Sequence, residues 1–305
     1  MPNRMLTLAL VWLTGPLFGQ PGNQIFSAGY GLPLLAPVAP GQVVTLFIRG
    51  LKAGPASAST LPLPTTLAGV SVSLKQAGGF SGPAPIFRIL PLDPAGLGCD
   101  GGRPVPCGLS AVTVQIPFEI RACGLDFSPC VSLTATAVEN GVAGEQLNLS
   151  TAPSRFHILN SCDATQVLAG CQLMILRPDG SLSQGFASPG EVLTVFAVGL
   201  GPTMPPVLSG TASPSPPARA ALPVSVLLDF KPNAFTLPGR ILREPRFVGL
   251  SPGSVGLYQL NIEMPDQIPP EARRCDSPSP FGTNMTLTVS VGGVTESVEI
   301  CVGQG

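Results

Sequence analysis

The chain has 305 residues, of which 44% are hydrophobic and only 11% are charged, and its 16 basic and 17 acidic residues leave it nearly neutral. So weak and balanced a charge argues against nucleic-acid binding, which requires a basic excess or a basic stripe. The 36 glycines and 36 prolines favour short β-strands joined by tight turns, because the apolar fraction is too high for a disordered chain.

The first residues have the pattern of a secretory signal peptide. A positive charge at Arg4 precedes an apolar run over residues 6–18, which is too short for a comfortable membrane span. We expect a signal peptide over residues 1–20, cleaved near Gly19, with an uncleaved anchor as the alternative. No later stretch is apolar for long enough to predict a membrane helix. The sequence therefore predicts a secreted or periplasmic protein without a membrane span after signal removal.

Short runs rich in β-branched residues, bounded by Gly, Pro or Asn, predict strands along the rest of the chain. In chain order, the expected strands cover residues 43–48, 70–74, 111–116, 131–138, 192–198, 224–228, 257–262 and 286–291. Asn140-Gly141 and Gly292-Gly293 are strong signals for hairpin turns. A proline directly follows Ile116 and another follows Met264, and each should end a strand. No amphipathic helix of three turns is expected.

One pattern of residues occurs twice. Residues 39–51 return as residues 188–200, with Pro, Gly, Val, Thr, Phe and a closing Gly-Leu in register. A period of about 150 residues has the length of a domain rather than of a solenoid unit. We therefore expect an all-β chain of two tandem immunoglobulin-like antiparallel β-sandwiches, over residues 21–154 and 155–305. A single large β-barrel or a jelly roll is the alternative.

Eight cysteines make an even number, which in an exported chain argues for disulfides. Many connectivities are possible, so the pairing stays open. The closest neighbours suggest four candidate pairs, which are Cys99 with Cys107, Cys123 with Cys130, Cys162 with Cys171, and Cys275 with Cys301. A zinc site is disfavoured because no C-x-x-C spacing occurs and the chain has one histidine. We expect no metal and no cofactor.

The order of these motifs resembles a known family. The order begins with the motif Pro-Gly-x-Val-x-Thr-x-Phe-x-x-Gly-Leu and continues with a Val-Ser-Val strand, residues 256–265 and residues 287–293. Asp179-Gly180 precedes the second copy of the motif. This order is similar to uncharacterised C-terminal modules of secreted acidobacterial proteins, related to the IPT/TIG branch of immunoglobulin-like domains. The resemblance extends from about Ile25 to Val302 and implies an accessory role without catalytic residues. The cysteines, and a signal peptide as the only segment ahead of the modules, depart from that family.

Catalysis finds little support in the sequence. His157 is the only histidine, so a Ser-His or Cys-His nucleophile would have to use it. Its alternating surroundings favour a strand residue beside the domain junction, and no G-x-S-x-G motif accompanies it. Carboxylates for glycoside hydrolysis would have to come from Asp229, Glu244, Glu263 and Asp266, which nothing in the sequence brings together. We expect no enzyme, with an extracellular hydrolase as the weakest alternative.

Sugar binding through an aromatic platform is also disfavoured. The only tryptophan, Trp12, lies in the expected signal peptide, which leaves Tyr30 and Tyr258, while Phe47 and Phe196 are expected to face the core. No Asp-rich run predicts calcium binding. Low charge, strand edges and Pro-rich loops favour contact with another extracellular or envelope protein. The sequence therefore predicts a structural, adhesion or protein-interaction module, with a carbohydrate-binding accessory protein on polysaccharide as the alternative.

Overall fold

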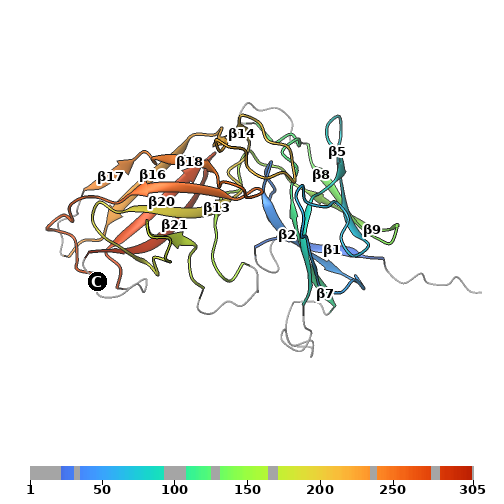
Figure 1. Cartoon of the computed structure of the whole chain (residues 1–305), viewed down its shortest axis with the longest axis horizontal. Coiled ribbons are helices and arrows are strands. Elements are labelled where there is room, and N and C mark those ends of the chain that lie inside the picture. The colour runs from blue at the N-terminus through green and yellow to red at the C-terminus, as the bar shows by residue number, and fades with distance from the viewer. Residues whose placement is uncertain are drawn as a thin grey trace, which may run out of the picture.

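The computed structural model describes residues 22–30, 35–92, 108–124, 131–163, 171–233, 239–275 and 282–303. The expected signal peptide lies outside these ranges. Within them the chain contains strands and no helix, so no helix there is long and apolar enough to cross a membrane. The strands form two groups that lie side by side (Figure 1), which we call the N-terminal half (residues 22–149) and the C-terminal half (residues 156–303).

The N-terminal half contains two sheets that pack around one core. The first has the order β1 (Gln24–Gly29), β2 (Val43–Arg49), β7 (Leu109–Gln115), β6 (Ile86–Pro91) and β3 (Ala56–Ser57). The second has the order β5 (Ser81–Pro83), β4 (Val70–Gln76), β8 (Leu133–Glu139) and β9 (Val142–Leu149). The sheets approach each other where the Glu145 N–H donates to the Asn23 carbonyl (2.8 Å). Leu46, Val72 and Val112 are among the core residues.

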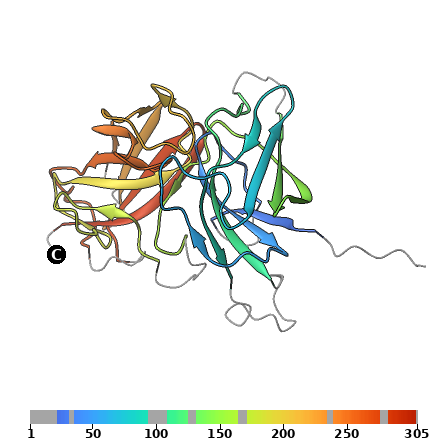
Figure 2. The same ribbon diagram turned by 45° about the vertical axis from the view of Figure 1, so that its right-hand side comes forward.

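The C-terminal half repeats this layered arrangement. One sheet has the order β10 (His157–Ile158), β13 (Val192–Val198), β19 (Tyr258–Glu263), β18 (Phe247–Leu250), β15 (Arg219–Ala220) and β14 (Thr203–Met204), with β11 (Ile175–Leu176) also pairing with β13. The other has the order β12 (Phe186–Ala187), β21 (Val294–Val302), β20 (Met285–Val291), β16 (Val224–Phe230) and β17 (Arg240–Arg243). Its buried residues form a core cluster separate from the N-terminal one, and Figure 2 shows its strands as a distinct group.

Alternation of apolar residues accounts for the long strands. In β4, β19 and β20 every second residue is buried, because successive side chains of a strand point to opposite faces. The all-β prediction is confirmed, and each of the eight expected strands is present with its end shifted by at most a few residues. Asn140 and Gly141 both have positive φ angles, as do Gly292 and Gly293, so both predicted hairpins turn through two left-handed residues.

The repeated pattern adopts the same local structure in both copies. Gly41 and Gly190 have φ angles of 73° and 71°, which is the conformation that a Pro-Gly turn requires at its second residue. The residue after each glycine closes its turn, because the Gln42 side chain accepts a hydrogen bond from the Ala39 N–H (2.8 Å) and Glu191 accepts one from the Ser188 N–H (2.6 Å). Strands of equal length, β2 and β13, follow the two turns.

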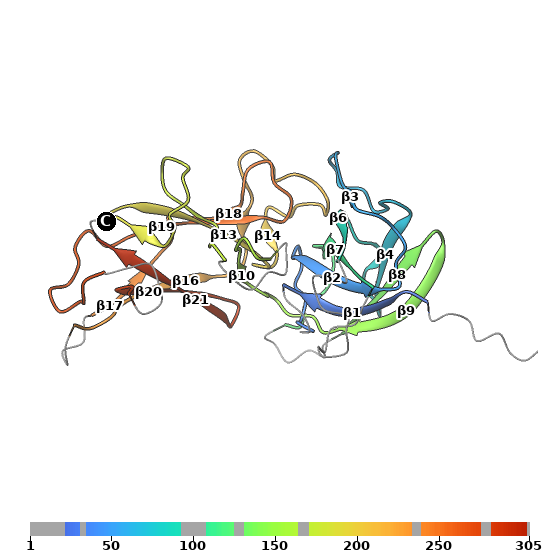
Figure 3. The same cartoon turned by 90° about the horizontal axis from the view of Figure 1, so that it is seen from below.

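One feature of the topology differs from the prediction. The turn signals predict antiparallel pairing throughout, but β12 pairs in parallel with β21, through Phe186 with Cys301 and Ala187 with Val302. The Cys301 N–H also donates to the Gly185 carbonyl (2.7 Å). A turn signal can predict only a local antiparallel pair, whereas this strand comes from a distant loop. Figure 3 shows the two halves end to end, so residues near their contact are candidates for a shared site.

Candidate functional site

The two halves meet through buried polar contacts around Gln115, the last residue of β7. Its side-chain carbonyl accepts a hydrogen bond from the Gly210 N–H (2.6 Å), and the Gly210 carbonyl accepts one from the Leu63 N–H (2.8 Å). Beside them, the Phe118 N–H donates to Ser209 Oγ (2.8 Å). Gln115 is fully buried, so its hydrogen bonds are shielded from water and hold the two halves in one orientation.

Gly256 and Gly41 lie where the two halves approach each other closely. A Cβ atom on Gly256 would lie 2.8 Å from Val43 Cγ2 and 2.9 Å from the Gly41 carbonyl oxygen. A Cβ atom on Gly41 would lie 2.0 Å from the Phe118 ring, which also packs against the C-terminal core. Both glycines have positive φ angles, a conformation that is costly for other residues. The contact between the halves therefore has no room for a side chain at Gly256, and within the N-terminal half the Phe118 ring occupies the space of a side chain at Gly41.

His157 forms a second cluster at this contact. Its Nδ1 lies 3.0 Å from Glu296 Oε1 and its Nε2 lies 3.0 Å from Asp163 Oδ1. Tyr30 of the N-terminal half stacks on the imidazole, with ring centroids 3.9 Å apart and planes inclined by 15°. The Tyr30 hydroxyl accepts a hydrogen bond from Gln42 Nε2 (2.8 Å). The cluster therefore joins side chains from both halves.

The surroundings of His157 determine its charge. Burial disfavours the charged ring, but hydrogen bonds to Asp163 and Glu296 outweigh burial and raise the pKa of His157 from 6.5 to about 9. At neutral pH both ring nitrogens therefore donate to carboxylates. Burial also raises the pKa of the Tyr30 hydroxyl far above its usual value. An imidazolium with both nitrogens engaged cannot accept a proton from a nucleophile, so this geometry suits an ion-pair cluster better than a general base.

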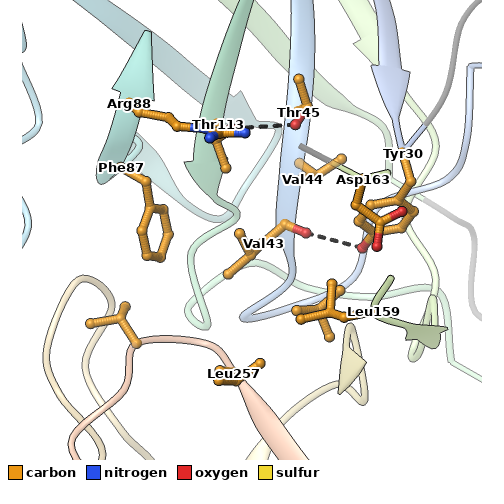
Figure 4. A pocket seen from close by; sticks show the side chains of 12 residues that line it. Tyr30, Val43, Val44, Thr45, Phe87, Arg88, Thr113, Leu159, Asp163 and Leu257 are labelled. Atoms are coloured by element: carbon orange, nitrogen blue, oxygen red, sulfur yellow. Dashed lines mark hydrogen bonds between the residues drawn. The ribbon is translucent and has the colours of Figure 1, made fainter. Parts of the chain in front are cut away.

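A cavity of about 310 Å³ lies between the halves beside this cluster (Figure 4), and we call it the junction cavity. Val43 and Phe87 of the N-terminal half and Val198 and Leu257 of the C-terminal half contribute apolar walls. Cavities at the contact of two structural units, mostly apolar and with few polar groups, are common binding sites for small molecules. Neither half encloses this space alone.

The structure joins two of the four candidate cysteine pairs, Cys162 with Cys171 and Cys275 with Cys301. Cys123 is also disulfide-bonded, and its candidate partner Cys130 lies outside the described residues. The Cys99 and Cys107 pair lies outside them as well. No free cysteine occurs in the described ranges. Next to the first disulfide, the Ser161 N–H donates to the Gln172 carbonyl (2.8 Å).

Neither tyrosine of the described residues presents its ring on an open surface where a sugar could stack. Tyr258 is fully buried and donates to the Gly201 carbonyl (2.5 Å), while Tyr30 is covered by His157. The expectation that Phe196 faces the core is wrong, because Leu193, Val195 and Ala197 take the inward positions of β13 and Phe196 lies half-buried on the other face. Phe47 is buried, but in a small cluster apart from the main core.

Two of the four acidic residues considered for glycoside hydrolysis form ion pairs with arginines. Asp229 forms an ion pair with Arg240 (3.1 Å) and Glu263 with Arg246 (2.5 Å). Glu244 is exposed, and the Asp266 carboxylate lies beside Gly190. Among the described residues, no group of three His, Cys, Asp or Glu side chains could hold a metal ion.

Sequence reasoning placed His157 beside the junction but missed its partners. Glu296 is separated from it by 139 positions along the chain, so no local pattern connects them. Gln115 was also missed, although a signal for it existed. Val112 and Val114 point to the core, so Gln115 points to the opposite face of the strand. If that face is covered by another part of the chain, the glutamine side chain needs a hydrogen-bond partner.

Comparisons with known proteins add no assignment. No protein-family model matches the chain, and no curated protein is significantly similar to it. A functional assignment therefore depends on the geometry and chemistry of the chain's own residues.

Proposed function

We propose that this protein is a secreted, non-catalytic interaction module built from two tandem immunoglobulin-like sandwiches, and that its partner is another extracellular or envelope protein. The disulfides Cys162–Cys171 and Cys275–Cys301 support a location outside the reducing cytoplasm. The low and balanced charge fits a protein partner better than nucleic acid. The observation that carries the proposal is an exposed apolar surface to which both halves contribute.

This apolar loop surface consists of residues 58–66 of the N-terminal half and residues 204–211 of the C-terminal half. Neither segment contains a charged residue. Leu61, Met204 and Leu208 expose 53%, 67% and 71% of their area, and they are three of the eight exposed large hydrophobic residues in the described ranges. Clusters of exposed apolar residues mark interaction sites, and the centres of protein interfaces are depleted in charge.

The two loops are held in place before any partner arrives. The Leu63 N–H donates to the Gly210 carbonyl (2.8 Å), and Thr211 Oγ1 donates to the Leu208 carbonyl (2.6 Å). Prolines in both segments restrict the backbone further. A loop that is already ordered loses little conformational entropy on binding, which favours affinity. At the edge of the surface Glu119 accepts a hydrogen bond from Ser209 Oγ (2.6 Å), so the apolar centre has a polar neighbour.

The test is site-specific photo-cross-linking on intact cells of the source. A photoreactive residue is placed at Leu208 in the tagged mature protein, and at Leu242 as a matched control. Leu242 is 72% exposed but lies on the distant edge strand β17. The proposal predicts one recurrent protein captured from Leu208 and not from Leu242, and loss of that capture when Met204→Asp and Leu208→Asp are combined.

Three results would overturn the proposal. Equal capture from both positions would show that the apolar loop surface has no special role. Capture of polysaccharide alone would favour a carbohydrate-binding accessory protein. Turnover of a hydrolase substrate by the purified protein, lost in His157→Gln, would favour an enzyme.

A further inference from the structure

The edge of strand β17 is a second surface on which another chain can dock. β17 (Arg240–Arg243) is the last strand of its sheet, and among the described residues it pairs with β16 alone. Figures 1 and 3 both show it on the C-terminal half, toward the end of the molecule that lies away from the N-terminal half. The outer side of an edge strand presents unpaired N–H and C=O groups, so it can pair with a strand of another chain.

The ladder of β16 determines which backbone groups face this edge. The Lys231 N–H donates to the Asn284 carbonyl (2.8 Å), which continues the pairing of β16 with β20 in the same register. In an antiparallel sheet the backbone groups of successive residues point to alternate neighbours, so Asp229 and Leu227 also bond to β20. Leu228, between them, therefore directs its N–H and C=O to β17.

The same alternation continues into β17. Ile241 pairs with Leu228, so its backbone groups point inward to β16. Those of Arg240 and Leu242 consequently point outward to the open edge. Glu244 follows this alternation and precedes a proline, which keeps its backbone extended. The open edge therefore offers the N–H and C=O groups of residues 240, 242 and 244.

The side chains of these three residues share the solvent face. Arg240, Leu242 and Glu244 are exposed, whereas Ile241 and Arg243 between them are half-buried on the core side. Leu242 exposes 72% of its area, which makes it the most exposed of the eight exposed large hydrophobic residues in the described ranges. The open edge thus carries a leucine between a basic and an acidic residue.

This pattern is complementary to a second copy of itself. When two β17 strands lie antiparallel with Leu242 opposite Leu242, Arg240 of each copy lies opposite Glu244 of the other. The backbone fits the same register, because the outward-pointing residues of both copies meet as hydrogen-bonded pairs. A shift by one residue would set outward-pointing backbone groups opposite inward-pointing ones, and would place Arg240 opposite Arg243.

From these features we propose that two copies of this chain pair through β17 into one continuous antiparallel sheet. Arg240 Nε forms an ion pair with Asp229 (3.1 Å), but the Arg240 side chain is 70% exposed. A guanidinium has five N–H donors, so its terminal nitrogens can hold Glu244 of the second copy while Nε keeps Asp229. The contact involves few residues, so the expected dissociation constant is micromolar rather than nanomolar.

The dimer does not depend on the partner of the apolar loop surface. That surface lies away from β17, so a dimer would present it twice, and a partner anchored on a cell would be bound with avidity. Only this consequence rests on the proposed function. In the photo-cross-linking experiment, the protein expected from Leu242 is a second copy of this chain.

The test is sedimentation velocity of the mature protein over increasing concentration. The proposal predicts a shift from monomer to dimer, and slower hydrogen exchange over residues 239–244 as the dimer forms. Leu242→Asp sets two carboxylates against each other at the centre of the contact and should keep the protein monomeric. Val142→Asp is the matched control, because Val142 is 68% exposed but lies on β9, and it should leave the dimer unchanged.

Two charge variants test the register. Arg240→Glu places like charges opposite each other twice per dimer, and Glu244→Arg does the same with the other sign, so each should weaken self-association about tenfold or more. An equimolar mixture of the two variants restores both opposite-charge pairs and should form a mixed dimer. Circular dichroism checks that every variant is folded.

The proposal is overturned if the unmodified protein stays monomeric at millimolar concentration, or if Leu242→Asp dimerises as well as the unmodified protein. A mixture of the two charge variants that associates no better than either alone would also overturn it. Capture of an extracellular partner from Leu208 requires none of these results, so the two proposals fail separately.

Discussion

His157 owes its charge to residues that the fold brings to it. Its pKa is about 9 in the folded protein and near 6.5 when the chain is unfolded. Because the folded-state pKa is the higher one, the stabilisation from this histidine is fully present below pH 6.5 and is lost as the pH rises through about 9. The difference between the two pKa values corresponds to about 3 kcal/mol of unfolding free energy.

We expect His157→Gln to remove this pH-dependent stabilisation. At pH 6 the variant should unfold with a free energy about 3 kcal/mol below that of the unmodified protein, because Asp163 and Glu296 lose their shared cation. At pH 10 the difference should be much smaller. Urea unfolding of both proteins at the two pH values measures it. A difference of equal size at pH 6 and pH 10 would contradict the assignment of an imidazolium.

A comparison of two asparagines, both in glycosylation-type sequence patterns, tests the value of buried amide contacts. Asn284 is buried, and its side chain donates to the Val302 carbonyl (2.7 Å) and accepts from the Val302 N–H (2.8 Å). Asn284→Ala leaves both backbone groups without these bonds and should cost about 2–4 kcal/mol. Asn148 is exposed, and its side chain accepts from the Thr134 hydroxyl (2.9 Å), so Asn148→Ala should cost less than about 0.5 kcal/mol. Equal midpoints of urea unfolding for the two variants would refute this difference.

At the scale of elements, local chemistry accounts for the long strands and their hairpins. Alternating burial in β4 and β20, and left-handed residues in the turns that follow β8 and β20, depend on neighbouring residues alone. The two-residue strands β10, β11 and β12 have no such pattern. Each of them pairs with the edge of a long strand, β13 or β21, so its position depends on where that strand lies in the fold. Long strands are therefore predictable from sequence, whereas these short ones follow from tertiary structure.

The β8–β9 turn allows a clean test of backbone conformation. Gly141 has a φ angle of 81° and open space where a Cβ atom would lie, whereas Gly54 has the same open surroundings without a positive φ angle. Gly141→Ala should therefore cost about 1–2 kcal/mol through strain alone. Gly54→Ala should be neutral or slightly stabilising, because it restricts the unfolded chain. Chemical denaturation of the two variants measures the difference, and a stable Gly141→Ala protein would show that the turn conformation is wrong.

At the scale of the whole molecule, the contact between the halves depends on a few buried polar groups. Gln115→Leu keeps the shape of the side chain but leaves the Gly210 N–H without its acceptor. We expect hydrogen exchange to accelerate about tenfold or more over residues 205–214, with little change in β16 and β20. Gln146→Leu, at an exposed position of β9, is the control and should leave exchange over residues 205–214 unchanged. Unaltered exchange in Gln115→Leu would mean that this bond does not hold the junction.

The site was far less predictable than the fold. His157 could be placed beside the junction, but Tyr30, Asp163 and Glu296 converge on it only once β10 and β21 have been positioned. The junction cavity has no signature at all in the sequence, since its walls come from loops and strands of both halves. The shape and size of a cavity depend on how completely two packed surfaces fill the space between them, and no local sequence pattern indicates this.

The all-β class, the long strands, the Pro-Gly turns that begin β2 and β13 and the Cys162–Cys171 pair follow from the sequence alone. These features follow from the φ angles, side-chain alternation and spacing of nearby residues. Only the tertiary structure decided the parallel pairing of β12 with β21, the charge of His157 and the cavity between the halves. Each of these requires residues far apart in sequence to meet, and their free energies depend on burial and distances that exist only after the sheets have packed.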